Sequence, residues 1–537
     1  MDSGSPGKPS AGSFAPLRQP VFAVLWTATV LGNTGVFMRD VASAWLATEL
    51  SASPAAAALV QTAATLPIFL FALVAGVLSD ILDRRRLLIG IQLLLASGSG
   101  CLLLLAHTGL LTVDALVLLT FVGGIGAALM GPTWQSIVPG LVRPSDLRHA
   151  VALNSLGINI ARALGPAAGG LLLTTVGAPT AYGAHMLSCA AVIAALVWWR
   201  PPAPRDTSGP EKFMSAFRAG LRYCGASREL HVVLLRAAAF FLFASSVWAL
   251  LAPVARQMPE GTAHVYGLLL GAVGVGAIVG ALLLPKLRDR LDADGLMLAA
   301  SMLSAGVMAG LSCAPPKWAA MLLMTLLGVA WIVALTTLNG AAQAVLPNWV
   351  RGRGLAIYLM AFNGAMAGGS LAWGLVAQQV GVLHALLISA VGLVVTAIAF
   401  NRIRLPAGED DLKPARHWPE PTLNTADTHA RGSVVVQIEY RVRSSDRQAF
   451  LRAMRGLARS RRRNGAYAWT LAAHTTDPSR VIEWFMVESW AEHLRQHDRV
   501  SKADAELQAQ VLRFHLGPDK PAVHHFLTMN PKSGHTR

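Results

Sequence analysis

Charged side chains are scarce in this sequence, and acidic ones are scarcest over its first three quarters. Only 14% of the 537 residues are charged and 54% are hydrophobic, and residues 1–403 hold 14 of the 29 aspartates and glutamates. Apolar runs of about 20 residues or more recur through that region, and such runs are typical of transmembrane helices. The composition therefore excludes an ordinary soluble protein.

Cysteine is also rare. The four thiols are scattered, mostly inside apolar runs, and have neither metal-ligand nor disulfide spacing: Cys101, Cys189, Cys224 and Cys313. We predict no metal and no cofactor. The net charge of +16 requires no nucleic-acid partner, because cytoplasmic loops of membrane proteins are rich in lysine and arginine.

The apolar runs predict twelve membrane spans. The first begins after 18 polar residues and is too long for a signal-peptide core, so we interpret it as an uncleaved span. The predicted spans are residues 20–48, 54–78, 87–107, 111–138, 146–176, 179–199, 231–256, 263–286, 294–313, 318–346, 353–380 and 381–401.

Basic residues are distributed very unevenly between the two sides of these spans. One set of alternate connections, with the flanks of the first and last span, holds 20 lysines and arginines, and the other set holds only Arg256 and Lys317. Basic connections stay on the cytoplasmic side. We therefore expect a multi-pass protein of the cell membrane with both termini in the cytoplasm.

Two motifs recur in the same order along the chain. QSIVPGLVR (135–143) returns as QAVLPNWVR (343–351), and GPAAGGLLLTTVG (165–177) returns as GSLAWGLVAQQVG (369–381). Two copies in one orientation are the parallel repeat of a two-lobed transporter, with a binding site between the lobes. We divide the chain into an N-terminal six-helix lobe (1–199), an inter-lobe loop (200–230), a C-terminal six-helix lobe (231–403), a linker (404–431) and a cytoplasmic domain (432–537).

The segment GVLSDILDRRRL (76–87) follows the second span and carries an acid–arginine cluster. We expect Gly76 to permit close helix packing and Asp80 to meet the positive end of a neighbouring helix in one transport state only. With Asp83, Arg84 and Arg85, these residues would form a gating latch. A positively charged anchor with incidental acids explains the cluster equally well.

Polar side chains also recur inside the spans. Ser155, Asn159 and Arg162 fall at i, i+4 and i+7, so they share a helix face that cannot comfortably face lipid. We expect such residues to line a substrate cavity, although hydrogen bonds between helices use the same residue types. The repeat offsets pair Asn159 with Asn363 and Gln135 with Gln343. The predicted cavity set is Asn33, Gln61, Gln135, Asn159, Arg162, Asn339, Gln343 and Asn363.

Together these motifs resemble the major facilitator superfamily. GVLSDILDRRR is similar to the family's signature loop between spans two and three, with Asp83 where the general pattern has glycine. With NSLGINIARALGPAAGG, the chain resembles the enterobactin-exporter-like branch of transmembrane secretion effectors, over about residues 15–403. The resemblance implies an all-α membrane domain and a proton-driven exporter in the bacterial inner membrane. Four residues resemble an exporter-associated motif of this family, although close helix packing explains them as well: Gly165, Pro166, Gly169 and Gly170.

Asp40 is the one acid of residues 1–403 that falls inside a span, roughly 9 Å outward of its middle at about 1.5 Å per residue. It shares a helix face with Asn33. Because helix neighbours point about 100° apart, we expect Arg39 not to pair with Asp40. We predict that Asp40, with Arg39 beside it, carries the coupled proton. Fixed polar partners, or a place in the outer vestibule, are the alternatives. His185 in the sixth span is a second candidate proton carrier, but a lone histidine is more often simply packed and hydrogen-bonded.

The sequence predicts a small soluble domain for the tail. Strands are predicted at 434–442, 466–474, 480–489 and 522–527, with helices at 446–463 and 490–514. The order βαββαβ is that of a ferredoxin-like sheet, and it resembles the dimeric domains of the antibiotic-biosynthesis-monooxygenase type, which implies a homodimer. We interpret His493 and His497 as part of a solvated helix face. Because no catalytic constellation is visible, we expect no enzyme.

The combined prediction is a proton-coupled exporter of a small organic molecule such as a siderophore, drug or secondary metabolite. Its partners would be that substrate, protons and the lipid bilayer. Two alternatives stay open: an uncoupled facilitator or lipid flippase, and a bifunctional carrier whose tail acts on the cargo or senses a ligand. No motif of the sequence identifies the substrate.

Overall fold

The computed structural model describes residues 14–200, 221–259, 261–347, 350–406, 433–499, 502–517 and 519–528. Most of the predicted linker and most of the inter-lobe loop lie outside these residues. The chain forms two compact units, which we describe separately. One comprises Met1–Thr207, Val232–Gly340 and Ala356–Leu405, and the other comprises Ser208–His231, Ala341–Leu355 and Pro406–Arg537.

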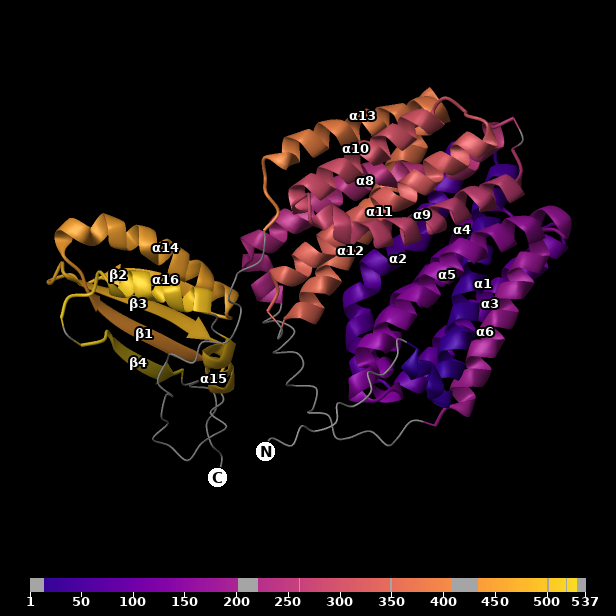
Figure 1. Ribbon diagram of the computed structural model, residues 1–537. Coiled ribbons are helices and arrows are strands. Elements are labelled where there is room, and N and C mark those ends of the chain that lie inside the picture. Colours follow the sequence, from indigo (N-terminus) through magenta and orange to yellow (C-terminus); the bar gives the residue numbers. More distant parts are fainter. Residues whose placement is uncertain are drawn as a thin grey trace, which may run out of the picture. The chain divides into compact units, whose positions relative to one another are not determined.

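Long helices build the first unit (Figure 1). Within the described residues, twelve helices are long and apolar enough to cross a membrane, and each matches a predicted span to within three residues at either end. They are α1(Pro20–Leu50), α2(Pro54–Ile81), α3(Arg84–His107), α4(Val113–Leu141), α5(Leu147–Thr175), α6(Ala178–Trp198), α8(Arg228–Gln257), α9(Ala263–Arg288), α10(Ala293–Leu311), α11(Lys317–Ala344), α12(Arg351–Val380) and α13(Val382–Asn401). Short 3₁₀ turns are η1(Ala15–Arg18) and η2(Pro144–Asp146).

Local sequence explains where these helices begin and end. Prolines stand at the first helical position of α1 and α2, where no hydrogen bond is lost. The Ser53 and Asp292 side chains accept hydrogen bonds from backbone N–H groups at the starts of α2 and α10. Gly177 and Gly381, with φ of +102° and +88°, separate α5 from α6 and α12 from α13. The termini are thus defined by residues that favour caps and turns.

The repeat is visible in the helix positions. α5 begins at residue 147 and α12 at residue 351, an offset of 204, and Gly177 and Gly381 are separated by the same distance. α4 and α11 also start 204 residues apart, at 113 and 317. The motif that pairs Gln135 with Gln343 has an offset of 208, and that pairing stays a prediction.

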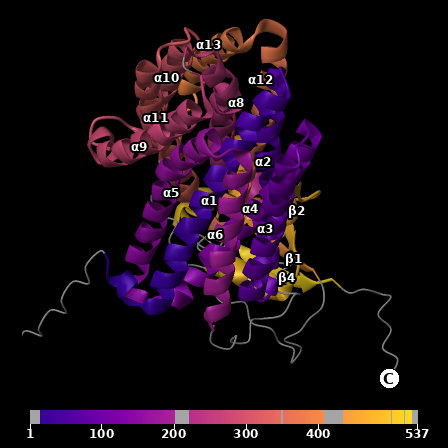
Figure 2. The same cartoon turned by 90° about the vertical axis from the view of Figure 1, so that its right-hand side faces the viewer.

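Helices α1–α6 gather on one side of the first unit and α8–α13 on the other (Figures 1 and 2). The two sets touch through small residues. A Cβ atom at Gly170 of α5 would lie 2.6 Å from the carbonyl oxygen of Ala263 at the start of α9. The Thr62 hydroxyl of α2 donates to the carbonyl oxygen of Ala367 in α12 at 3.3 Å. These contacts lie in the half of the bundle where α1 ends and α2 begins.

The second unit contains a four-stranded antiparallel sheet in the order β2-β3-β1-β4. Helices α14 and α16 lie side by side over it (Figure 1). Alternate residues of β1 and β3 are buried in a core with Phe450 and Met454 of α14. The predicted second helical region consists of two helices. The elements are β1(Val434–Arg441), η3(Ser444–Asp446), α14(Arg447–Arg463), β2(Tyr467–Ala473), β3(Arg480–Val487), α15(Trp490–Arg499), α16(Lys502–Leu512) and β4(Ala522–Leu527).

Candidate functional site

The charged pair of α1 is an ion pair. The Nε and Nη2 atoms of Arg39 donate to one carboxylate oxygen of Asp40 at 3.0 and 2.6 Å. The expectation that the two residues do not pair is therefore wrong. It followed from the directions of the Cβ atoms, but the arginine side chain is long enough for its guanidinium to reach the carboxylate of the next residue. The attraction between opposite charges is strong in a medium of low dielectric constant.

The two members of this pair have different surroundings. The Arg39 side chain is 8% exposed and that of Asp40 is 41% exposed. The guanidinium lies against Gly123 of α4, where an added Cβ atom would be 2.6 Å from Nη1. Gly123 thus provides the space that holds the Arg39 head in place. The carboxylate is left at the accessible side of the pair.

Arg39 also lines a cavity of about 230 Å³ enclosed by α1, α3, α4 and α6. Thr29, Asn33, Gln92 and His185 contribute its other polar side chains. The His185 ring is fully buried and lies 2.6 Å from the Ser99 hydroxyl and 3.5 Å from the Cys189 thiol. Both ring nitrogens therefore have partners, as the simpler interpretation of a lone histidine requires.

A second space of about 100 Å³ adjoins this cavity through shared walls, among them Asn33 and Met130. Trp26, Trp134 and Asn154 line it, and the Trp26 indole N–H donates to the carbonyl oxygen of Leu153 at 2.9 Å. Indole faces beside amide groups form an amphipathic surface. Of the predicted cavity residues, Asn33 lines both spaces.

The other predicted cavity residues occupy different places. Asn159 and its repeat counterpart Asn363 each donate the side-chain amide to the carbonyl oxygen four residues earlier, at 2.9 and 2.8 Å. Asn363 is only 5% exposed and does not line either of the two cavities. Arg162 donates to Asn159 at 3.5 Å. Half-buried or exposed positions outside the two cavities are occupied by Gln61, Gln135, Asn339 and Gln343.

The predicted gating motif holds the N-terminal lobe together. Arg84 donates to the carbonyl oxygens of Ser79 and Ser136, and Arg85 donates to the last carbonyls of α6, on Leu196 and Val197, at 2.7 and 2.6 Å. Arginines that cap helix carbonyls in this way stabilise helix ends.

Asp83 and Gly76 of the same motif have surroundings that the structure describes. The Asp83 carboxylate accepts the Arg86 N–H at 2.8 Å and so caps α3, which explains an acid where the general pattern has glycine. A Cβ atom at Gly76 would meet no described atom within 4 Å, so the expected close packing there is wrong. The close approach occurs at Gly280 of α9, where a Cβ atom would lie 2.5 Å from Ile332. The side chain of Asp80 lies outside the described part of the structure.

The glycine–proline motif of α5 lies between two helices. Cβ atoms at Gly165 and Gly169 would lie 2.6 Å from Phe37 and 2.8 Å from Met38 of α1. Gly170 and the Pro166 carbonyl face α9 at Ala263 and Gly267. The motif therefore permits α5 to touch one helix of its own lobe and one of the other lobe.

Several site residues were missed from the sequence. Gly267, Gly271 and Gly274 of α9 accept the close approach of α5, and their spacing of four and three residues is a small-residue pattern that the sequence displays. Gly123, Gln92 and Asn154 carry no such local signal. They join the site only because α3, α4 and α5 pack around α1.

Comparison with solved structures identifies the fold of the membrane domain. The chain is similar to nucleoside transporter NupG, with a TM-score of 0.58 and 12% identity over 71% of this chain and 98% of that one. It is also similar to a bacterial homologue of the human lysosomal transporter Spinster, with a TM-score of 0.59 and 16% identity over 72% and 97% of the two chains. Such identities show the fold alone. The membrane domain has the major facilitator fold, with twelve spanning helices among the described residues.

Sequence comparison narrows this class to one family. The family model described as transmembrane secretion effector matches residues 11–533, so the chain belongs to the transmembrane secretion effector family of major facilitator transporters. Multidrug efflux pump Tap of Mycobacterium tuberculosis is 28% identical over 422 residues, covering 75% of this chain and 98% of Tap. Enterobactin exporter EntS of Escherichia coli is 30% identical over 47% of this chain and 59% of EntS, and the staphyloferrin A transporter of Staphylococcus aureus is 24% identical over 62% and 84%.

These matches differ in how much of the chain they cover. Because nearly all of Tap corresponds to 75% of this chain, about a quarter of the chain has no counterpart there. The family model, in contrast, extends to residue 533 and thus through the four-stranded sheet. The family is one of transporters and not of enzymes.

Proposed function

We propose that this chain is a proton-coupled exporter of small amphipathic organic molecules, such as drugs, siderophores or other secondary metabolites. It would act in the bacterial inner membrane, with both termini in the cytoplasm. The observation that carries the proposal is the Arg39–Asp40 ion pair, which stands inside a membrane helix and borders a polar cavity. The similarity to Tap, EntS and the staphyloferrin A transporter supports the direction and the substrate class.

The pair supplies a physical route for coupling. Protonation of Asp40 would remove the counter-charge of Arg39, whose guanidinium is almost completely buried. Leaving that buried guanidinium without a counter-charge costs free energy. The lobe recovers that energy only by moving Arg39 or by placing another polar group beside it. A proton taken up from outside would thus favour the state that releases cargo and returns empty.

The adjoining cavities define the kind of molecule. Trp26, Trp134 and Met130 offer apolar and aromatic surface, and Asn33 and Asn154 offer amide groups. A mostly apolar lining with a few polar groups can bind amphipathic compounds of different structures. Arg39, which lines the larger of the two cavities, would bind an anionic or strongly polar group of the cargo when Asp40 is protonated.

Everted membrane vesicles test the transport proposal. Export appears there as uptake, so vesicles with this protein should accumulate ethidium when respiration energises them. A protonophore should abolish that accumulation. Rapid equilibration that the protonophore leaves unchanged would instead indicate an uncoupled facilitator, and retention of a fluorescent phospholipid in place of ethidium would indicate a flippase.

We also propose that the tail is a ferredoxin-like, non-enzymatic domain that pairs two copies of the chain. The element order and the strand order support the fold. The sheet face opposite the core carries half-buried Val435, Trp484 and Met486 and the 52% exposed Phe526. Apolar patches of this kind mark interaction sites. Native mass spectrometry of the full chain should show a dimer that Trp484→Glu dissociates; a monomer in both proteins would refute the pairing.

A further inference from the structure

Residues 221–226, which we call the bridge helix, form a short helix ahead of α8. They belong to the same compact unit as the tail domain and as residues 341–355, which connect α11 to α12. Its described residues contact both of these other parts of the unit, the tail through Arg222 and the α11–α12 connection through Tyr223.

The tail contacts two successive residues of the bridge helix. Nη1 of Arg222 lies 2.6 Å from a carboxylate oxygen of Glu488, which stands between β3 and α15. The guanidinium of Arg463, the last residue of α14, lies 5.8 Å from the centre of the Tyr223 ring. Ion pairs and cation–π contacts of this geometry are individually modest, but here they come from two separate elements of the tail.

The bridge helix also contacts the α11–α12 connection. Tyr223 is 1% exposed, and its hydroxyl donates to the carbonyl oxygen of Val345 at 3.2 Å. The next residue, Cys224, is 4% exposed, and burial raises the pKa of its thiol to about 11 against the opposing charge of Arg353. The thiol therefore stays neutral and packs as an apolar group. Tyr223 thus contacts both a tail arginine and the backbone of the α11–α12 connection.

We propose that the tail is a regulatory domain that acts on the transporter through the bridge helix. By holding Arg222 and Tyr223, it orders the connection that joins α11 to α12. Any event that shifts the end of α14 or the β3–α15 junction, such as pairing of two tails or binding of a ligand, would pass to that connection. The role depends neither on the substrate nor on proton coupling.

Hydrogen–deuterium exchange of the full-length protein in lipid nanodiscs tests this directly. Arg222→Glu places like charges opposite each other and should raise exchange in residues 221–226 and 341–347 by about threefold or more. The exchanged pair, Arg222→Glu with Glu488→Arg, should restore protection. Tyr223→Phe keeps the ring for Arg463 but removes the hydrogen bond to Val345, so it should raise exchange at 341–347 only.

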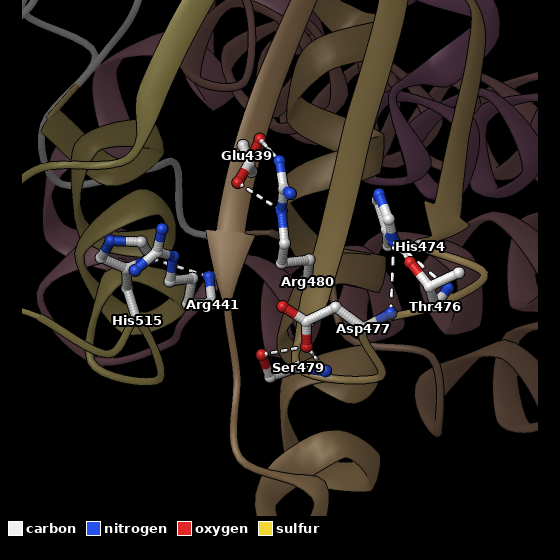
Figure 3. Close-up of polar contacts among 8 residues, drawn as sticks. All are labelled: Glu439, Arg441, His474, Thr476, Asp477, Ser479, Arg480 and His515. Atoms are coloured by element: carbon white, nitrogen blue, oxygen red, sulfur yellow. Dashed lines mark hydrogen bonds and ion pairs between the residues drawn. The ribbon is translucent and has the colours of Figure 1, made fainter.

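The tail itself offers a matched control. Glu439 and Arg480 form a two-bonded ion pair between β1 and β3, with both N–O distances 2.8 Å (Figure 3). Arg480→Glu should loosen these strands and leave residues 221–226 and 341–347 protected. The proposal is overturned if Arg222→Glu leaves both segments as protected as in the unmodified protein, if the exchanged pair fails to restore them, or if Arg480→Glu exposes them equally.

Discussion

In α1, Arg39 donates two hydrogen bonds to a single carboxylate oxygen of Asp40, its neighbour in the sequence. The arginine is buried against Gly123, and the aspartate remains 41% exposed. We propose that the more exposed Asp40 carries the proton and that the buried Arg39 responds to the loss of its counter-charge. This relationship between adjacent residues is the basis of the proposed coupling.

The space at Gly123 should be essential for that relationship. In Gly123→Val, the added carbon atoms would occupy the position of the Arg39 guanidinium, since a Cβ atom alone lies 2.6 Å from Nη1. We expect proton-driven uptake by everted vesicles to fall about tenfold, which corresponds to about 1.4 kcal/mol. Gly140→Val, on the same helix but with no atom within 4 Å of the new Cβ, should transport normally. Equal activity of both variants would show that the position of Arg39 is unimportant.

The close contact between α5 and α9 should limit movement of the two lobes. Gly170→Val would press its Cβ against the Ala263 carbonyl oxygen, 2.6 Å away, at a cost of about 1–3 kcal/mol. Spin labels near the starts of α6 and α9 should report a longer distance in this variant. Gly98→Val, where nothing lies within 4 Å, is the control and should leave the distance unchanged. An unchanged distance in Gly170→Val would refute the role of the motif as an interlobe contact.

Membrane spans and tail strands were predictable because they depend on local apolar patterns and turn residues. The positions of the side chains depended also on side-chain flexibility and on the packing of helices and strands. Arg39 could not be placed from Cβ directions because its flexible length decides where the guanidinium goes. His493, expected on a solvated face, is 1% exposed, with its ring 4.8 Å from that of His525 in β4. Only the packing of α15 on the sheet decides that burial. The side chain of His497 lies outside the described residues.

Arg85 should stabilise the N-terminal lobe without taking part in transport. Its guanidinium caps the carbonyls of Leu196 and Val197, so Arg85→Ala should lower the free energy of unfolding by about 1–2 kcal/mol. Arg86→Ala, an exposed neighbour in the same run, should have little effect. Thermal unfolding of the detergent-solubilised protein distinguishes the two. A loss of transport in Arg85→Ala at unchanged stability would instead favour the gating latch.

The tail should lose stability in mild acid. The Arg441 N–H donates to Nδ1 of His515 at 3.0 Å (Figure 3), so that ring nitrogen must be unprotonated. Desolvation and the nearby Arg441 charge lower the pKa of His515, and desolvation likewise lowers the pKa of His525. Because the unfolded chain then binds more protons, stability falls as the pH drops below the ordinary histidine value of about 6.5.

Tryptophan fluorescence during chemical unfolding at pH 7.5 and pH 5.5 measures this effect. The tail transition should move to lower denaturant concentration at pH 5.5, and the shift should be smaller in His515→Gln, which retains an acceptor for the Arg441 N–H. A tail transition at the same denaturant concentration at both pH values would contradict the prediction.

The decisive measurement concerns Asp40. Everted vesicles containing Asp40→Asn, which removes the titratable group but keeps its size, should bind ethidium with unchanged affinity yet fail to accumulate it when energised. Glu49→Gln changes the other acid of α1, whose carboxylate accepts from the Trp45 indole at 2.6 Å, and should accumulate ethidium normally. Full, protonophore-sensitive accumulation by Asp40→Asn would contradict the assignment of Asp40 as the proton carrier.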